Sequence, residues 1–191
     1  MSRILVVPGS TRSAAFSKQL ARAAAAMAAA HGASATVVDL RDFAMPLYDG
    51  DLEAASGLPE GAVKLRTVAQ QHDAFLFISP EYNASLPAVL KNALDWLSRP
   101  HAGEPGSAVF RGKVAALLAS SPGALGGLRA LVHLRQVLQN LGLLVITEQY
   151  ALGSAGSAFA GDGSLADPKQ AAGVDHVVRS LATIAARLAG G

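Results

Sequence analysis

The sequence predicts an α/β domain built on a doubly wound sheet of five parallel strands, in the order 2-1-3-4-5, with helices on both faces. The first observation is that short, uncharged apolar runs alternate with longer amphipathic segments, a pattern typical of βαβ units. The second is that small or polar loops follow the first, third and fourth of these runs. In this strand order those three strands are neighbours, so their loops meet at one edge of the sheet, where such folds bind mononucleotides.

The expected elements alternate along the chain. Five short apolar runs bounded by turn residues predict strands, at 4–7, 35–38, 74–79, 113–120 and 143–146. Helices are expected after each strand: an alanine-rich one ending near 30, one at 59–71, one entering at Pro87, one after Gly127, and a last one after 167. Three segments have no steady period and read as loops, at 39–59, 99–112 and 151–167.

Helical spacing assigns a buried stripe to each of the last two helices. The fourth helix carries its stripe on residues Leu131, Leu134, Leu138 and Leu141, with His133, Gln136 and Asn140 on the other face. The last helix carries its stripe on residues Val174, Val177, Leu181, Ile184 and Leu188. We expect Trp96 in the core, and Lys91 and Asp95 to pair at i,i+4.

Composition limits the possible functions. The 191 residues suit a single domain, 1–191, with 51% hydrophobic and 16% charged residues. The chain has no cysteine, which excludes disulfides and thiolate chemistry. The net charge is +2 without a Lys/Arg run, so no nucleic-acid partner is expected. The five histidines lack ligand spacing with Asp or Glu, so no metal is expected. We find no signal peptide and no transmembrane run, so we expect a cytoplasmic protein without a membrane partner.

The loop after the first strand has the chemistry of a phosphate site. Gly9 lets the backbone approach a ligand closely, Ser10 and Ser17 offer hydroxyls, and the following helix presents its N-terminus. Arg12 adds a charge-assisted fork. The alternative is structural: Ser17 is an ordinary N-cap and Arg12 a solvated loop residue.

Four motifs point to a known family. They are Gly9-Ser10-Thr11-Arg12, Pro80-Glu81-Tyr82-Asn83-Ala84-Ser85-Leu86-Pro87, Leu90-Lys91-Asn92-Ala93-Leu94-Asp95-Trp96-Leu97-Ser98 and Ser120-Ser121-Pro122-Gly123-Ala124-Leu125-Gly126-Gly127. With them the chain resembles the NAD(P)H-dependent FMN reductases, in the branch with bacterial chromate and quinone reductases. The resemblance covers about Arg3 to Tyr150. It implies a flavodoxin-like fold that holds FMN non-covalently and oxidises NADPH or NADH.

The resemblance also implies the site residues. Ser10, Arg12 and Ser17 would hold the FMN phosphate, alongside Gly9. The isoalloxazine ring would be lined on one side by Pro80, Glu81, Tyr82 and Asn83, with Ser120 and Gly123 facing the other side. The chain departs from the family where relatives commonly read Ser-x-Asn and this one has Ala15-Phe16-Ser17.

The function implied is hydride transfer from the nicotinamide to flavin N5. The reduced flavin then passes electrons to a flavin, quinone or similar small acceptor, in ping-pong order. No catalytic side chain is expected, because the flavin carries the chemistry. One alternative is a flavodoxin-like electron carrier without its own turnover, although carriers usually present a strongly acidic docking surface and this chain is slightly basic. A second alternative is a scaffold that has lost its flavin.

Self-association is expected, to a dimer or a tetramer. Relatives assemble in this way, and the mean hydropathy of this chain is high at +0.32. The segment Phe43–Tyr48 places several large apolar residues in an expected surface loop. In such an assembly Arg129 and Glu148 are expected to meet Tyr82 of another subunit.

Overall fold

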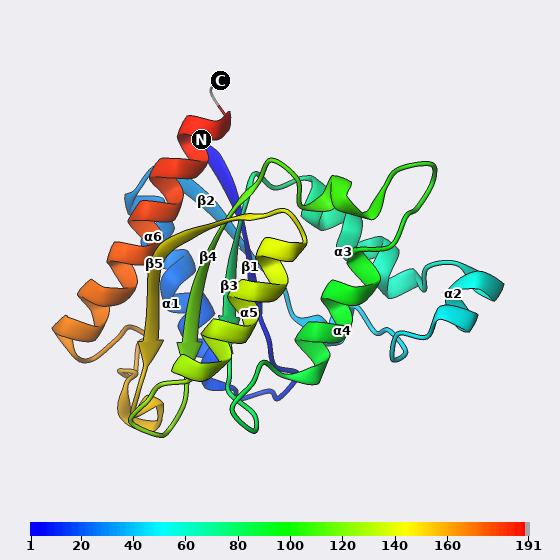
Figure 1. Ribbon diagram of the computed structural model, residues 1–191. Helices are drawn as coiled ribbons and strands as arrows, with labels where there is room; N and C mark the ends of the chain where they lie inside the picture. Colours follow the sequence, from blue (N-terminus) through cyan, green and yellow to red (C-terminus); the bar gives the residue numbers. More distant parts are fainter. Residues whose placement is uncertain (190–191) are drawn as a thin grey trace.

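A computed structural model describes residues 1–189 of the chain and shows one parallel sheet with helices on both faces (Figure 1). The strands are β1 (Ser2–Pro8), β2 (Ala33–Val37), β3 (Ala74–Ser79), β4 (Val114–Ser120) and β5 (Leu144–Leu152). Their spatial order is β2-β1-β3-β4-β5, and all neighbours pair in parallel. The predicted fold class and strand order are therefore confirmed.

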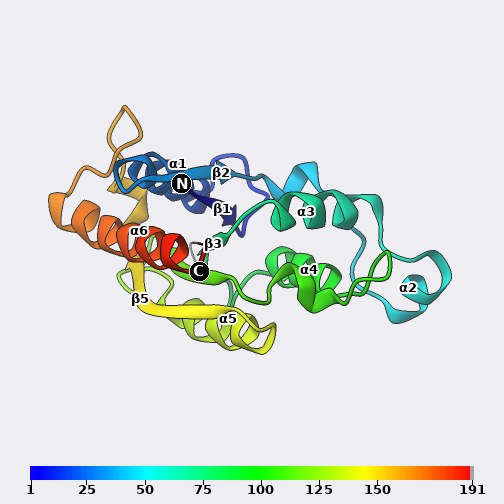
Figure 2. The same ribbon diagram turned by 90° about the horizontal axis from the view of Figure 1, so that it is seen from above.

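Each face of the sheet has its own apolar cluster. The helices are α1 (Phe16–Ala30), α2 (Gly50–Ser56), α3 (Glu60–Gln70), α4 (Ala88–Leu97), α5 (Leu128–Asn140) and α6 (Pro168–Ala189). Buried residues of α1 and α6 pack with one face, and those of α3, α4 and α5 pack with the other (Figure 2). The central strands β3 and β4 are buried at every position, as expected for strands covered on both sides.

Most of the predicted stripe residues are buried; Leu141 and Ile184 pack against the core while half-buried, and Leu188 is exposed. Leu131, Leu134 and Leu138 are buried, as are Val174, Val177 and Leu181 in α6. Leu188 was expected to be buried, but it is 48% exposed because the last turn of α6 runs past the sheet (Figure 1).

The core and pairing expectations for α4 hold. Trp96 is fully buried and donates its indole N–H to the Pro46 carbonyl at 2.9 Å. The predicted Lys91–Asp95 pair forms at 2.7 Å. In residues 1–189 no helix is both long and apolar enough to cross a bilayer.

Segment 39–59 is not the irregular loop that we predicted. It contains the 3-10 helix η1 (Leu40–Asp42) and α2, which lies at the outer edge of the molecule (Figure 1). Asp49 caps α2 by accepting from the Asp51 N–H at 2.8 Å, and Gly57 ends it with φ 69°. None of its residues is buried, so no apolar period marks it in the sequence.

Strand β5 is also longer than predicted, since it runs to Leu152 instead of ending at Ile146. A bulge shifts the register, because Ala115 pairs with Val145 whereas Leu117 pairs with Gln149. Of the added residues, Thr147 is exposed, Glu148 to Ala151 are half-exposed and Leu152 is buried, and the bulge interrupts the alternation of the strand. Two further 3-10 helices, η2 (Gly106–Val109) and η3 (Ala155–Ser157), complete the connections.

Candidate functional site

A cavity of about 300 Å³ opens at the carboxyl ends of β1, β3 and β4, where the three small-residue loops meet. It brings together most of the residues that the sequence singled out. They are Ser10, Arg12, Ser17, Pro80, Glu81, Tyr82 and Ser120. Ala15, Phe16, Ser121 and Pro122 complete the lining. Because these residues come from separate loops, the strand order itself assembles the cavity.

Three predicted residues, Gly9, Asn83 and Gly123, do not line this cavity. Gly9 serves packing, because a Cβ there would lie 2.9 Å from Cδ2 of Leu90 on α4. The Gly123 carbonyl accepts from the N–H groups of Gly126 and Ser154, and so ties its own loop together. Asn83 is exposed on the tip of a turn described below.

The first loop holds its polar groups close to the start of α1. The Ser10 hydroxyl accepts from the Arg12 N–H at 3.2 Å and lies 3.5 Å from the Tyr82 hydroxyl. The Arg12 guanidinium donates to the Ala14 carbonyl at 3.1 Å and lies 5.8 Å from the Phe16 ring centroid. Arg12 is therefore folded over the helix start, within reach of the cavity that it lines.

Ser17 is not the N-cap of α1. Ala15 holds that position with extended backbone and no side-chain cap, so Ser17 lies in the first turn. Its hydroxyl is buried, and among residues 1–189 it has no hydrogen-bond partner. Ser120, across the cavity, has the same property. A buried hydroxyl without a partner is costly, and two of them in one cavity indicate that a polar ligand belongs there.

A partly buried ion pair supports the first loop from behind. The Lys18 ammonium lies 2.7 Å from the Asp39 carboxylate, which also accepts from Arg41 at 2.8 Å. Arg41 in turn donates to the Ser13 hydroxyl at 3.0 Å. The bonds from Arg41, and then from Lys18, hold the pKa of Asp39 well below its usual range.

The loop after β3 folds back as a tight turn. Tyr82 and Ser85 exchange both backbone bonds, at 3.0 and 3.1 Å, while Asn83 and Ala84 between them have φ values of 50° and 62°. Two successive positive φ angles are those of a type I′ turn, and for Ala84 this conformation costs about 1 kcal/mol. Because the Tyr82 N–H is used inside the turn, it is not a free donor to a ligand.

Glu81 fastens this turn to α5. Its carboxylate accepts from the backbone N–H groups of Arg129 at 3.0 Å and Ala130 at 3.3 Å. It also accepts from the Arg129 side chain, through Nε at 2.7 Å and through Nη2. The Arg129 guanidinium is the main cause that holds the pKa of Glu81 below its usual value. Ser85 adds a second tie, 2.9 Å from Nδ1 of His133.

Sequence reasoning did not anticipate the Glu81–Arg129 pair. One signal for it exists, because the first turn of α5 has no acidic residue and carries an arginine, Arg129, at its second position. A cation near a helix N-terminus is unfavourable, and it predicts a carboxylate from elsewhere in the fold. Phe16, Ser121 and Pro122 were also missed as lining residues, since only the folded loops bring them to the cavity.

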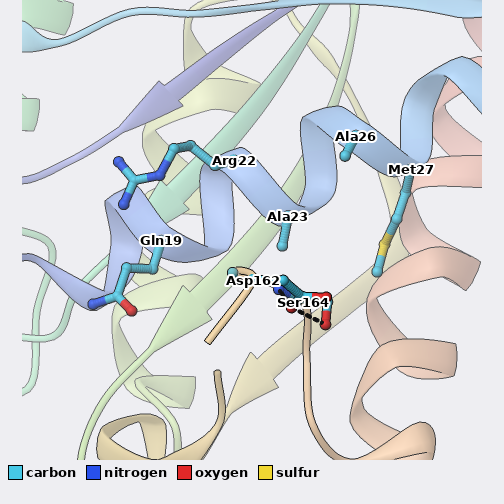
Figure 3. A pocket seen from close by; sticks show the side chains of 8 residues that line it. Gln19, Arg22, Ala23, Ala26, Met27, Asp162 and Ser164 are labelled. Carbon is cyan, nitrogen blue, oxygen red and sulfur yellow. Dashed lines mark hydrogen bonds between the residues drawn. The ribbon is translucent and has the colours of Figure 1, made fainter. Parts of the chain in front are cut away.

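A second cavity, of about 470 Å³, lies between α1 and the segment after β5 (Figure 3). Ala23, Ala26 and Met27 line it from α1, facing Asp162 and Ser164 across it. Asp162 and Ser164 satisfy each other at 2.7 Å, and none of the predicted site residues is present. Although it is larger, this cavity presents fewer groups that could bind a ligand than the cavity at the sheet edge.

Comparison with known proteins identifies the family of the chain. The family model described as NADPH-dependent FMN reductase matches residues 2–157. The chain belongs to this family. The resemblance seen in the sequence motifs is thereby confirmed, and with it the FMN cofactor and the NAD(P)H co-substrate of the family.

Individual proteins similar to this chain carry names that match the family. The chain is 38% identical over 166 residues to a quinone reductase of Pseudomonas putida, covering 86% of this chain and 84% of the relative. It is 35% identical over 189 residues to an NAD(P)H-dependent FMN reductase of Pseudomonas aeruginosa, covering 98% and 97%. The solved structure of the flavoenzyme NAD(P)H:(acceptor) oxidoreductase FerB from Paracoccus denitrificans matches with a TM-score of 0.84 at 28% identity, over 98% of each chain.

Proposed function

We propose that this protein is an FMN-dependent NAD(P)H oxidoreductase that reduces quinones, flavins or similar small acceptors. The observation that carries the proposal is the cavity at the sheet edge, with the buried, unpartnered hydroxyls of Ser17 and Ser120 in its wall. Membership of the FMN reductase family and relatives named as quinone reductases support the same activity. They favour an enzyme over the electron-carrier alternative.

The residues at the start of α1 fit the phosphate of FMN. Ser10 and Ser17 offer hydroxyls, and the exposed Arg12, which donates to the Ala14 carbonyl, lines the same cavity. The first turn of α1 contains no acidic residue, so the positive end of the helix dipole is available to an anion. Lys18 adds no free charge, because Asp39 neutralises it.

The remaining loops fit the ring of FMN. Pro80 and Tyr82 would lie along one side, and Ser120 would donate its unpartnered hydroxyl from the other. Asn83 and Gly123 stay candidates at the rim, where backbone groups reach a ligand without lining the present cavity. Glu81 contributes backbone only, since its carboxylate is turned toward α5.

The division of work is simple. When bound, FMN supplies the redox chemistry between NAD(P)H and the acceptor. The protein residues bind the phosphate, orient the ring between two loops, and keep water from its buried side. We expect the two substrates to use the same open side in turn, which gives ping-pong kinetics.

The absorbance spectrum of the purified protein, before and after FMN addition, tests the cofactor. Flavin bands that stay with the protein through gel filtration are expected, and a colourless protein that takes up no FMN would favour the scaffold that has lost its flavin. Steady oxidation of NADPH with a benzoquinone tests the enzyme. Slow bleaching without turnover would favour the carrier.

We further propose a cytoplasmic, single-domain protein, 1–191, that assembles as a dimer or tetramer. Of the expected apolar loop, Phe43 and Met45 pack against the core, while Leu47 is 77% exposed. A second exposed apolar group lies at the start of α5, on Leu125, Leu128 and Val132. Light scattering at micromolar concentration tests assembly, and a mass near the 19.4 kDa of one chain would contradict it.

We also propose that Arg129 and Glu148 contact Tyr82 of another subunit, and the structure limits how Arg129 can do so. Arg129 already pairs with Glu81 of its own chain, so a partner's tyrosine would join an existing ion pair. Tyr82 is 51% exposed and accessible for such a contact.

A further inference from the structure

The Glu81–Arg129 pair places one charge inside the cavity wall and the other outside it. Glu81 lines the cavity, and its side chain is only 8% exposed. Arg129 does not line the cavity, and its side chain is 59% exposed. The carboxylate is therefore buried in the wall of the cavity, turned toward α5, while its counter-charge lies at the surface.

A buried carboxylate beside a flavin opposes reduction, because reduction adds negative charge to the cofactor and like charges repel strongly away from water. Here the carboxylate is compensated by the Arg129 guanidinium and by the N–H groups of Arg129 and Ala130. The positive end of the α5 dipole acts in the same direction. The net charge that the cavity presents thus depends on Arg129.

We propose that Arg129 is a positioning residue that acts through Glu81, and that the pair sets how much more tightly the cavity holds reduced FMN than oxidised FMN. This inference rests on the proposed function, in which FMN occupies the cavity. It assigns to Arg129 a redox role that is separate from any contact between subunits.

A purely mechanical role predicts a different result. The pair also fastens the Tyr82 turn to α5, and a loosened turn would weaken the binding of both redox states of FMN by the same factor. The ratio of the two dissociation constants distinguishes the electrostatic role from the mechanical one. A change of charge alters the ratio, whereas a loosened turn weakens both redox states equally and leaves the ratio unchanged.

The experiment measures dissociation constants for oxidised and for anaerobically reduced FMN, in the wild type, Arg129→Gln, Glu81→Gln and the double variant. For Arg129→Gln, reduced FMN should weaken on the order of tenfold more than oxidised FMN, as expected for one uncompensated nearby charge. Glu81→Gln should shift the ratio the other way, and the double variant should return it toward the wild type. The midpoint potential of bound FMN should fall in Arg129→Gln, rise in Glu81→Gln and return toward the wild-type value in the double variant.

Arg129→Lys is the matched control, because it keeps the charge but loses the fork that grips the carboxylate. It should keep the ratio near the wild-type value even if the turn loosens. Thermal unfolding of the FMN-free variants checks that each one folds, and if Arg129→Gln does not, the ratio in Glu81→Gln against Arg129→Lys decides the question.

Equal weakening of both redox states in every variant would overturn the inference and leave the proposed function intact. A wild type that binds no FMN at all would instead remove the proposed function, and this inference with it.

Discussion

The ammonium of Lys18 lies 2.7 Å from the carboxylate of Asp39, and this ion pair sits directly behind the loop that we assign to phosphate. The Lys18 side chain is only 7% exposed. Water therefore solvates its charge only weakly. The pair links the first turn of α1 to the start of η1, just after β2.

Asp39→Asn should therefore destabilise the protein by about 1.5–3 kcal/mol, the value of a hydrogen bond between charged groups that are partly shielded from water. The asparagine keeps an oxygen that can accept from the Arg41 N–H, so the cap of η1 survives. Denaturant unfolding at pH 7 measures the loss. Asp42→Asn is the control, because Asp42 is exposed nearby, and a loss as large there would contradict the prediction.

The same pair gives a pH dependence with a definite sign. The pKa of Asp39 is lowered in the folded protein, so its stabilisation is complete above the unfolded pKa, about 4. Stability should fall as the pH drops from there toward the folded pKa. In Asp39→Asn this part of the acid sensitivity should be absent, which acid titration followed by circular dichroism checks.

Ser17→Ala tests whether the unpartnered hydroxyl serves a ligand. Without FMN the variant should be as stable as the wild type or more so, because it removes a buried polar group that has no partner. FMN binding should weaken by about 0.5–1.5 kcal/mol, the value of one hydrogen bond. Ser2→Ala is the matched control, since Ser2 has a similar hydroxyl at the start of β1. Equal FMN affinity in wild type and Ser17→Ala would remove Ser17 from the site.

Arg12→Ala should weaken FMN binding by about 1.5–3 kcal/mol, the size of a hydrogen bond to a charged group. Arg22→Ala is the control: it removes an exposed charge from α1 that lines the second cavity, and it should have a much smaller effect. Titration calorimetry at two salt concentrations measures both. Similar losses in the two variants would mean that only general charge matters.

Ala15→Ser restores a hydroxyl at the position where the chain departs from its relatives, and it should tighten FMN binding by about 0.5–1.5 kcal/mol. The structure adds a second expectation. Because Ala15 is the N-cap of α1, serine there should also stabilise the FMN-free protein, by about 1 kcal/mol. A gain in thermal stability without tighter FMN binding would show a cap and no phosphate contact.

The arrangement of the site followed from rules that act along the whole chain. Uncharged runs such as 74–79 predict strands buried on both faces, and the strand order 2-1-3-4-5 then decides which loops meet. That is why Ser10, Tyr82 and Ser120, far apart in sequence, were expected together and line one cavity.

What failed depended on side-chain direction or on exposed structure. Helix α2 buries nothing, so it leaves no period to detect. The continuation of β5 lies beyond a bulge that breaks its alternation. The direction of the Glu81 side chain was not predicted: its carboxylate turns to α5, where four donors bind it. Composition and spacing do not encode such a choice.

Helix α6 lies beyond the residues that the family model matches, yet it supplies much of the cluster that covers one face of the sheet. Its residues are translated after all five strands. Until they leave the ribosome, apolar side chains of β1, β3 and β4 on that face are covered by α1 alone, and the nascent sheet is partly open to chaperones or to other chains. Since the contacts of α6 with β1 join distant parts of the sequence, closing this face should be a late and slow step of folding.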